Sequence, residues 1–202
     1  MNRTEVLRYI AGLRNGSPMI ISPGLANYAI ADAKEEPLTL YNMDMPYTTP
    51  MALGIALGWP EHRVISIEGD GSLLAGPGVL STVARYQPKN LLVFVFDNGA
   101  YLTTGSGKAP TATVFGTDIE QLARAAGMEK TRTVGDLDTA KRAVNAAFTE
   151  PGPWLIVAKV DRQDRPDERV RHSLPMRVDE AGLIFHRAAL RERSKEAASR
   201  KV

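Results

Sequence analysis

Two short polar segments hold the side chains of this sequence that are best suited to binding a charged ligand. One is Glu68-Gly69-Asp70-Gly71-Ser72, and the other is Phe96-Asp97-Asn98-Gly99-Ala100-Tyr101. Asp70 offers an anionic oxygen and Asn98 a neutral amide oxygen, and Mg²⁺ takes such oxygens together with water and phosphate oxygens. The glycines beside Asp70 let the backbone approach a ligand closely. The serine and the helix start that follow are suited to holding a phosphate group.

Each polar segment follows a pattern typical of a buried strand. Residues 63–68 are rich in β-branched side chains, and residues 90–96 form the longest apolar run of this kind. A helix expected over residues 76–86 fits between the two strands. Ligands of open parallel sheets bind beyond the carboxyl ends of the strands, so we expect both segments to face one crevice.

Each motif alone is a weaker signal, since Gly-Asp-Gly and Asp-Asn-Gly are also ordinary turn sequences. Their combination is more specific, because both follow buried strands and 26 residues lie between Gly71 and Asn98. That interval holds one helix and one strand. The spacing therefore favours a shared diphosphate–Mg²⁺ site over two unrelated turns.

The rest of the chain alternates between strand and helix patterns. Strands are expected over residues 19–21, 38–41, 131–134 and 154–158, and helices over residues 4–14 (capped by Thr4), 25–33, 49–57, 118–126 and 137–148. Residues 99–117 have no clear period and are expected to form a loop. The alternation predicts an α/β fold, a doubly wound parallel sheet with helices on both faces.

The last part of the chain departs from this alternation. Residues 1–160 are expected to form the binding domain, and residues 161–178 a polar arm. Residues 179–199 are expected to form an amphipathic helix, with one apolar side made by Leu183, Ile184, Phe185, Ala188 and Leu190.

The composition excludes several classes of function. The chain has 202 residues, 44% of them hydrophobic, which is enough for one domain with a core. The net charge is +2, from 25 basic and 23 acidic residues, and the excess lies in the tail, so no nucleic-acid partner is expected. No membrane-spanning run or signal-peptide pattern occurs, which favours a cytoplasmic protein. The absence of cysteine excludes disulfides, thiolate metal sites and cysteine nucleophiles.

The arrangement Gly69-Asp70-Gly71, 26 intervening residues and Asn98 resembles the cofactor signature of thiamine-diphosphate-dependent enzymes. This chain has Asp97 before Asn98, where the family often has two asparagines. The resemblance implies the thiamine-diphosphate-binding fold. It also implies that Mg²⁺ is held by the side chains of Asp70 and Asn98 and by the backbone carbonyl of Ala100.

The likeness extends to an earlier turn. Met43-Asp44-Met45-Pro46 is similar to the family's Gly-Ser-Met-Gly turn, with Met43 and Pro46 in place of the glycines. The family pattern implies that the Met43 carbonyl accepts a hydrogen bond from the aminopyrimidine and that Met45 wedges beneath the cofactor. The alternative is that Met45 fills space in a loop. The implied cofactor-binding residues are Met43, Met45, Gly69, Asp70, Gly71, Ser72, Asn98, Ala100 and Tyr101.

Over residues 1–160 the chain resembles the sulfopyruvate and phosphonopyruvate decarboxylases within this family. The resemblance implies a carboxy-lyase that acts on a small 2-oxo acid. Three alternatives stay open: an acetolactate-synthase-like subunit, a non-catalytic cofactor-binding scaffold, and a different phosphate–Mg²⁺ protein of the same fold. A ferredoxin-linked oxidoreductase subunit is less favoured, because such chains commonly carry cysteines that ligate clusters.

Thiamine enzymes also need a carboxylate against the aminopyrimidine, and in the family a separate pyrimidine-binding domain supplies it. Glu5 is expected on a surface helix, and Glu35-Glu36 in a polar loop, so neither is suited to that role. The catalytic residue of this chain is therefore unassigned. We expect an oligomer in which a partner subunit supplies the glutamate, and we expect the chain alone to be inactive.

Other polar side chains are weaker candidates. Surface or packing roles are favoured for His62, His172 and His186, because none has an evident orienting partner. The hydroxyls and Lys108 of residues 101–108 are suited to contacting phosphate or an anionic substrate, but a solvated loop is the equal alternative.

Overall fold

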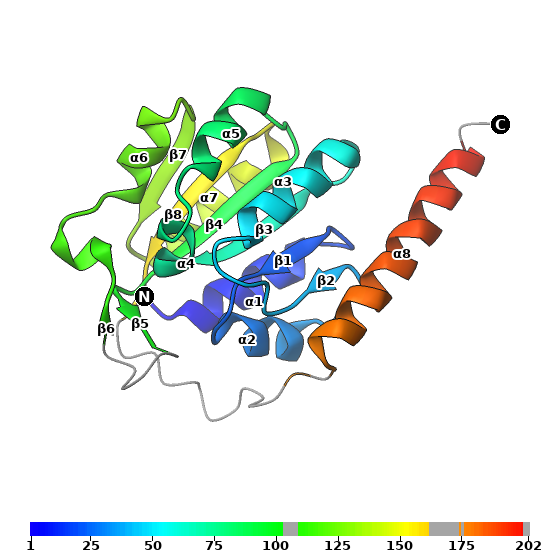
Figure 1. Cartoon of the computed structure of the whole chain (residues 1–202), viewed down its shortest axis with the longest axis horizontal. Coiled ribbons are helices and arrows are strands. Elements are labelled where there is room, and N and C mark those ends of the chain that lie inside the picture. The colour runs from blue at the N-terminus through cyan, green and yellow to red at the C-terminus, as the bar shows by residue number, and fades with distance from the viewer. Residues whose placement is uncertain (103–108, 162–173, 175, 200–202) are drawn as a thin grey trace.

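The computed structural model describes residues 1–102, 109–161, 174 and 176–199. Six parallel strands form one sheet in the order β2-β1-β3-β4-β8-β7 (Figure 1). These strands are β1 (Met19–Ile21), β2 (Thr39–Leu40), β3 (Val64–Gly69), β4 (Leu91–Asp97), β7 (Lys130–Val134) and β8 (Trp154–Lys159). The parallel sheet predicted from the alternating pattern is confirmed.

Helices cover both faces of the sheet. One face carries α1 (Arg3–Leu13), α2 (Ala26–Ala33) and α7 (Leu137–Thr149), and the other carries α3 (Thr48–Gly58), α4 (Asp70–Leu74), α5 (Val79–Tyr86) and α6 (Ile119–Ala125). Alternate side chains of a strand point to opposite faces, so β4 contributes to both cores. Leu92 and Phe94 pack with α1 and α7, while Val93 and Val95 pack with α3 and α6.

The order of the strands creates a crevice at the carboxyl ends of β1 and β3. From β1 the chain passes through α2 to β2 on one side, and it then returns through α3 to β3 on the other side. Because α2 and α3 cover opposite faces, the loops after β1 and β3 diverge from one another. Ligands of doubly wound sheets bind at such a switch point.

Three local expectations were wrong. The cap of α1 is Asn2 instead of Thr4, since Asn2 Oδ1 accepts a hydrogen bond from the Thr4 amide at 2.8 Å. The helix expected over residues 76–86 begins at Val79, and the short helix α4 precedes it. The expected loop over residues 99–117 contains the antiparallel pair β5 (Ala100–Tyr101) and β6 (Ala109–Pro110) and a 3₁₀ helix (Ala112–Phe115).

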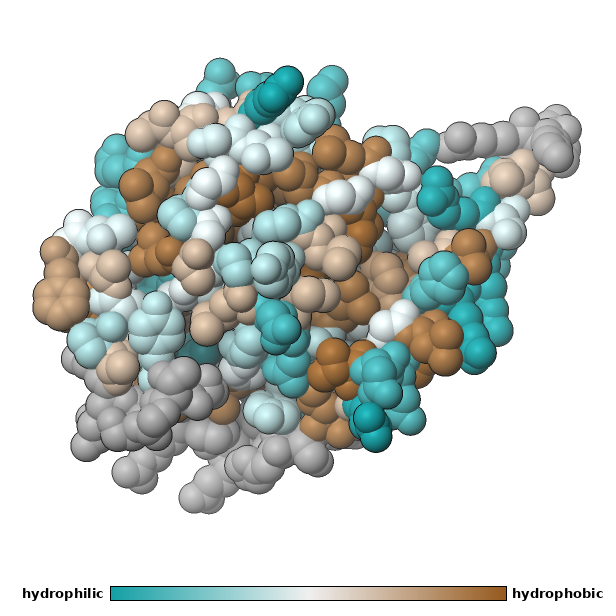
Figure 2. Space-filling model, in the orientation of Figure 1, coloured by the Kyte–Doolittle hydropathy of each residue, from teal (hydrophilic) through white to brown (hydrophobic). Residues whose placement is uncertain are grey.

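The expected last helix is present as α8 (Val178–Ser199), but only part of its predicted apolar side faces the body. Ala181 is buried, whereas Leu183 and Leu190 are 50% and 54% exposed. Phe185 and Ala189 line a groove between α8 and α3, where apolar side chains gather on the face seen in Figure 2. Most of the arm expected at residues 161–178 lies outside the described residues. No helix in the described part of the chain is long and apolar enough to cross a membrane.

Candidate functional site

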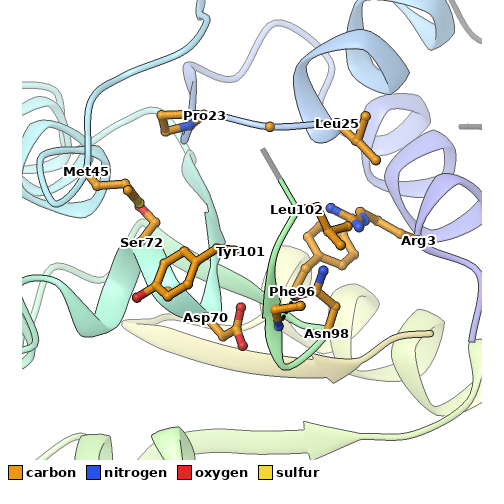
Figure 3. A pocket seen from close by; sticks show the side chains of 14 residues that line it. Arg3, Pro23, Leu25, Met45, Asp70, Ser72, Phe96, Asn98, Tyr101 and Leu102 are labelled. Atoms are coloured by element: carbon orange, nitrogen blue, oxygen red, sulfur yellow. Dashed lines mark hydrogen bonds between the residues drawn. The ribbon is translucent and has the colours of Figure 1, made fainter. Parts of the chain in front are cut away.

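A small pocket lies beyond the carboxyl ends of β1, β3 and β4 (Figure 3). It is lined by Arg3, Pro23, Gly24, Leu25, Met45, Gly69, Asp70, Gly71, Ser72, Phe96, Asn98, Ala100, Tyr101 and Leu102. Its cavity volume is about 80 Å³. Sites that enclose a whole small-molecule ligand usually measure roughly 300–1,000 Å³, so this pocket offers one wall of such a site.

The pocket brings together nearly all of the residues singled out from the sequence. Eight of them line it: Met45, Gly69, Asp70, Gly71, Ser72, Asn98, Ala100 and Tyr101. Met43 does not line it and instead borders the groove between α3 and α8. The Met43 amide donates to the Ile21 carbonyl at 2.9 Å, and the Met43 carbonyl accepts from Thr48 Oγ1 at 3.4 Å.

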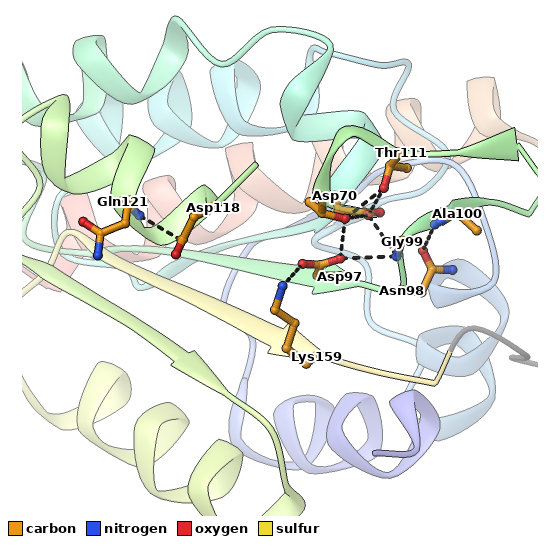
Figure 4. A network of polar contacts seen from close by, with 10 residues as sticks. Asp70, Asp97, Asn98, Gly99, Ala100, Thr111, Asp118, Gln121 and Lys159 are labelled. Carbon is orange, nitrogen blue, oxygen red and sulfur yellow. Dashed lines mark hydrogen bonds and ion pairs between the residues drawn. The ribbon is translucent and has the colours of Figure 1, made fainter. Parts of the chain in front are cut away.

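Asp70 is the centre of a buried polar network (Figure 4). The carboxylate is 2% exposed, and its Oδ2 accepts hydrogen bonds from Thr111 Oγ1 at 2.5 Å, Thr113 Oγ1 at 3.0 Å and the Gly99 amide at 3.1 Å. Burial raises the pKa of Asp70 and the neighbouring Asp97 raises it further, while hydrogen bonds from the two threonines oppose these effects. The network fixes the orientation of the carboxylate at the carboxyl end of β3.

Asp97 is the second carboxylate of this network. Its Oδ1 accepts from Thr113 Oγ1 at 2.8 Å and from the Gly99 amide at 3.2 Å, and its Oδ2 forms an ion pair with Lys159. Asp97 and Lys159 are direct partners in the β4–β8 register, which explains why they meet. The pairing compensates the charge of one of the two adjacent carboxylates.

Asn98 and Ala100 lie in the turn after β4. Asn98 Oδ1 accepts a hydrogen bond from the Ala100 amide at 3.1 Å. An amide oxygen has two lone pairs, so this contact is compatible with a further ligand. Gly99 between them has φ +67°, and an added Cβ would meet Val114 Cγ2 at 2.8 Å. The turn therefore needs glycine at this position.

The backbone of Gly71 lies against the ring of Tyr101. A Cβ at Gly71 would lie 2.2 Å from Tyr101 Cε1, so the ring occupies the space that any side chain would take. Next along the chain, Ser72 is 4% exposed, and its buried Oγ interacts with the Glu68 carboxyl but makes no hydrogen bond of standard geometry. This part of the pocket thus combines a close backbone approach with an unsatisfied hydroxyl.

Glu68 directly precedes Gly69 of the pocket lining, and its side chain faces α3. Its Oε1 accepts from the Thr49 amide at 2.9 Å and from Thr49 Oγ1 at 2.8 Å, while its Oε2 is buried without a hydrogen bond. Burial raises the pKa of Glu68 to about 7, although interactions with Ser72 and Thr49 oppose the shift. The carboxyl group is therefore poised between its two protonation states near neutral pH.

No sequence pattern marks the side chains that shape the walls of the pocket. Asn27 is fully buried, and its Nδ2 donates to the carbonyls of Ser22 at 2.8 Å and Gly24 at 2.9 Å. Its Oδ1 accepts from the Asn42 amide at 2.8 Å, and Ser22 Oγ accepts from the Gly69 amide at 3.1 Å. These contacts tie the loops after β1 and β2 to each other and to the carboxyl end of β3. Thr111 and Thr113 were missed for the same reason, since they lie far from Asp70 in sequence.

The remaining sequence candidates lie elsewhere. Glu36 pairs with the buried Arg14 at 3.0 Å and Glu5 is exposed on α1, so neither faces the pocket. His62 contacts Glu196 of α8, and His186 is exposed on that helix. His172 and residues 103–108, which include Lys108, lie outside the described residues. Within the described ranges, no group of three or more His, Cys, Asp or Glu side chains is arranged to hold a metal ion.

Comparison with known proteins agrees with this fold. Residues 26–158 match the family described as thiamine pyrophosphate enzyme, C-terminal TPP binding domain, and the chain belongs to this family. A solved structure of a thiamin diphosphate-dependent enzyme isolated from Mycobacterium smegmatis supports the fold, with a TM-score of 0.63 and 19% identity. That similarity covers 80% of this chain and 32% of the other.

Several of the relatives are decarboxylases by name. Sulfopyruvate decarboxylase subunit beta of Methanocaldococcus jannaschii is 30% identical over 78% of this chain and 82% of that protein. Sulfopyruvate decarboxylase of Methanosarcina acetivorans is 29% identical over 92% of this chain but only 46% of that protein. Phosphonopyruvate decarboxylase of Streptomyces hygroscopicus is 36% identical over 52% of this chain and 25% of that protein. The family inferred from the Gly69-to-Asn98 spacing is confirmed.

Proposed function

We propose that this chain is the diphosphate- and Mg²⁺-binding subunit of a thiamine-diphosphate-dependent decarboxylase of small 2-oxo acids, of the sulfopyruvate or phosphonopyruvate type. The observation that carries the proposal is the convergence of Asp70, Asn98 and Ala100 on one pocket, in a chain of the thiamine pyrophosphate enzyme family. The names of the relatives support the reaction and the substrate class.

The residues present fit a Mg²⁺–diphosphate group. The hydrogen bonds from Gly99, Thr111 and Thr113 to Asp70 all end on Oδ2, so Oδ1 is the oxygen that would bind the metal. Asn98 Oδ1 and the Ala100 carbonyl would complete a set of hard oxygen ligands, which suits Mg²⁺. The unsatisfied Ser72 hydroxyl would donate to a phosphate oxygen. Met45 would support the ring system, and the Met43 carbonyl would orient the aminopyrimidine.

The bound cofactor would supply the nucleophilic carbon and the electron sink for decarboxylation, while this chain supplies binding and orientation. Tyr101 lies over Gly71 and would shield the diphosphate from solvent. Among the described residues that line the pocket, Asp70 is the only carboxylate, and it is assigned to the metal. The catalytic glutamate is therefore expected on another chain.

A partner subunit would complete the site. The pocket offers one wall, and the methanogen relative carries the name subunit beta. The Methanosarcina relative is about twice the length of the matched region, which leaves room for a second half in the same chain. We propose that residues 1–160 form the cofactor half-site, that residues 161–202 form an arm and a helix, and that the active form is an oligomer.

Calorimetric titration tests the proposal. Thiamine diphosphate is titrated into the purified chain with and without Mg²⁺, for the wild type, Asp70→Ala and the control Asp32→Ala, whose side chain lies 3.9 Å from Arg8. We expect saturable, Mg²⁺-dependent binding by the wild type and the control, and no binding by Asp70→Ala. If the chain alone does not bind, the titration is repeated with the candidate pyrimidine-binding subunit. No binding in that mixture would contradict the proposal.

The open alternatives differ in the product. A scaffold would bind the cofactor with the partner present but release no CO₂ from sulfopyruvate or phosphonopyruvate. An acetolactate-synthase-like subunit would form acetolactate from pyruvate. A different phosphate–Mg²⁺ protein would not retain thiamine diphosphate.

A further inference from the structure

Arg3 lies in the pocket without a role in the function proposed above. It begins α1 and lines the pocket beside Asn98, Phe96 and Leu102 (Figure 3). Its guanidinium carbon is 5.8 Å from the centroid of the Phe96 ring, and its Nε and Nη2 atoms are buried. Of the described residues that line the pocket, Arg3 is the one with a cationic side chain.

The position of Arg3 is set by ordered structure. Asn2 caps the first turn of α1 through the Thr4 amide, and Thr4 and Val6 are both buried. The start of the helix is therefore packed against the body of the domain. A side chain held in this way loses less conformational freedom when it binds a ligand.

The pocket has two distinct ends. Met45 lies at one end and Arg3 at the other, with Asp70 and Asn98 between them (Figure 3). If Met45 supports the rings of the cofactor and Asp70 and Asn98 hold the metal, then Arg3 lies beyond the metal, on the side away from the rings. The group of the cofactor that reaches farthest from its rings is the terminal phosphate.

The charge of the site favours a cation at this end. A diphosphate carries more negative charge than one Mg²⁺ neutralises, and the Asp70 carboxylate adds to it. Lys159 is already paired with Asp97 and does not line the pocket. A guanidinium group offers paired donors that match phosphate oxygens, and it is favoured where phosphate is bound out of bulk water.

We infer that Arg3 binds the terminal phosphate of the cofactor diphosphate and thereby selects the diphosphate over the monophosphate. This inference rests on the proposed function. It assigns to α1 a part in cofactor recognition alongside the loops after β3 and β4.

The test measures the affinity of thiamine diphosphate and of thiamine monophosphate, each with Mg²⁺, by calorimetry in the mixture of chain and partner subunit. The variant Arg3→Met removes the charge but keeps an unbranched stem to pack on Phe96. The control is Arg8→Met, on the same helix with a side chain 44% exposed. We expect Arg3→Met to weaken diphosphate binding roughly ten- to hundredfold, to leave monophosphate binding within about twofold, and Arg8→Met to change neither.

Two results would overturn the inference: unchanged diphosphate affinity in Arg3→Met, or an equal loss for both ligands. Thermal unfolding checks that the variant is folded. If Arg3→Met does not fold, Arg3→Lys keeps a positive charge without the paired donors, and an intermediate loss confined to the diphosphate is expected. Failure of the wild type and of Arg8→Met to bind thiamine diphosphate would instead overturn the proposed function itself.

Discussion

Glu68 and Asp70 are two residues apart, yet their surroundings give their carboxyl groups different tasks. The Asp70 carboxylate is hydrogen-bonded by side chains from a distant segment and faces the pocket. The Glu68 carboxyl faces α3 and has one oxygen without a hydrogen bond. Asp70 is thus suited to a metal ion, whereas Glu68 makes the stability of the domain sensitive to pH.

Glu68→Gln should flatten the dependence of stability on pH. The pKa of Glu68 is about 7 in the folded chain, above its ordinary value of 4.5, so the folded state holds the proton more tightly. This contribution is present below about pH 4.5 and is lost as pH rises through about 7, a change on the order of 3 kcal/mol. Above pH 7 the glutamine variant should be the more stable, because its side chain stays neutral.

Urea unfolding of the metal-free chain between pH 5 and pH 8 measures this effect. The exposed Glu129→Gln serves as the control and should follow the wild type. Parallel pH profiles for Glu68→Gln and the wild type would show that burial does not shift the titration of Glu68.

Gly71→Ala should preserve the fold but weaken cofactor binding. The new methyl group would overlap the Tyr101 ring, whose Cε1 atom lies 2.2 Å from the Cβ position. The ring can swing away, so the strain in the free protein is modest, on the order of 1–3 kcal/mol, but the ring would leave the place from which we propose that it shields the diphosphate.

We expect an affinity for thiamine diphosphate that is roughly tenfold lower or weaker still. The control is Gly78→Ala, where a Cβ meets nothing within 4 Å. Equal affinity in the two variants would argue that the Tyr101 ring plays no part in binding.

The site residues that were predictable from sequence are those that sit directly after a strand. The positions of Asp70, Asn98 and Ala100 could be predicted from their spacing, because the strands before them end at one edge of the sheet. Thr111 and Asn27 have no such marker. Their roles come from how loops return over the sheet, which depends on tertiary packing and not on local pattern. Met43 borders the groove between α3 and α8, and the role predicted for its backbone carbonyl stays a prediction.

At the scale of elements, strands and helices with a strong period were predictable, and short elements were not. The strand β4 is buried on both faces, so it needs a continuous apolar run, and that run made it predictable. The five-residue helix α4 and the two-residue strands β5 and β6 are too short to have a period. They form because the chain must turn sharply after β3 and β4, a requirement visible only in three dimensions.

Helix α8 was correctly located, but only part of its predicted apolar side faces the body. Its sequence places Leu183 and Phe185 among the apolar positions, yet Ala181 is the buried residue and Glu196 holds the far end. Phe185 lines the groove as the pattern predicts, but the contacts of the small Ala181 and the polar Glu196 are not marked by a hydrophobic pattern. The side of a long surface helix that packs against the domain therefore depends on the residues it contacts there.

Glu196→Ala should loosen the second half of α8. Glu196 accepts a hydrogen bond from Trp59 Nε1 at 3.0 Å and contacts His62, and these two residues follow α3. Hydrogen exchange of the amides after Leu190 should become faster, while global stability should change by only about 1 kcal/mol, since the pair is partly exposed.

Glu192→Ala is the matched control, because Glu192 pairs with Lys195 of the same helix. Unchanged exchange in Glu196→Ala would mean that the groove side chains alone hold α8 in place.

For the whole molecule, the central expectation is that chemistry requires a second chain. The pocket of about 80 Å³ presents a wall, and its described lining supplies no carboxylate beyond Asp70. Decarboxylation of sulfopyruvate or phosphonopyruvate should therefore be detected only when this chain is mixed with a pyrimidine-binding subunit.

The measurement is CO₂ release by each chain separately and by the mixture, with Mg²⁺ and thiamine diphosphate in excess. Replacing the activating glutamate of the partner should abolish the rate without preventing complex formation. Turnover by this chain alone would place a catalytic carboxylate within its own sequence.

One buried amide has a consequence for how the molecule meets its ligand. Asn27 joins the loop after β1 to the backbone at Asn42, and Ser22 joins that loop to Gly69. These segments around the pocket are thereby held together by hydrogen bonds before any ligand binds. The ordering of this wall is then completed during folding, so ligand binding need not oppose the entropy of three independent segments.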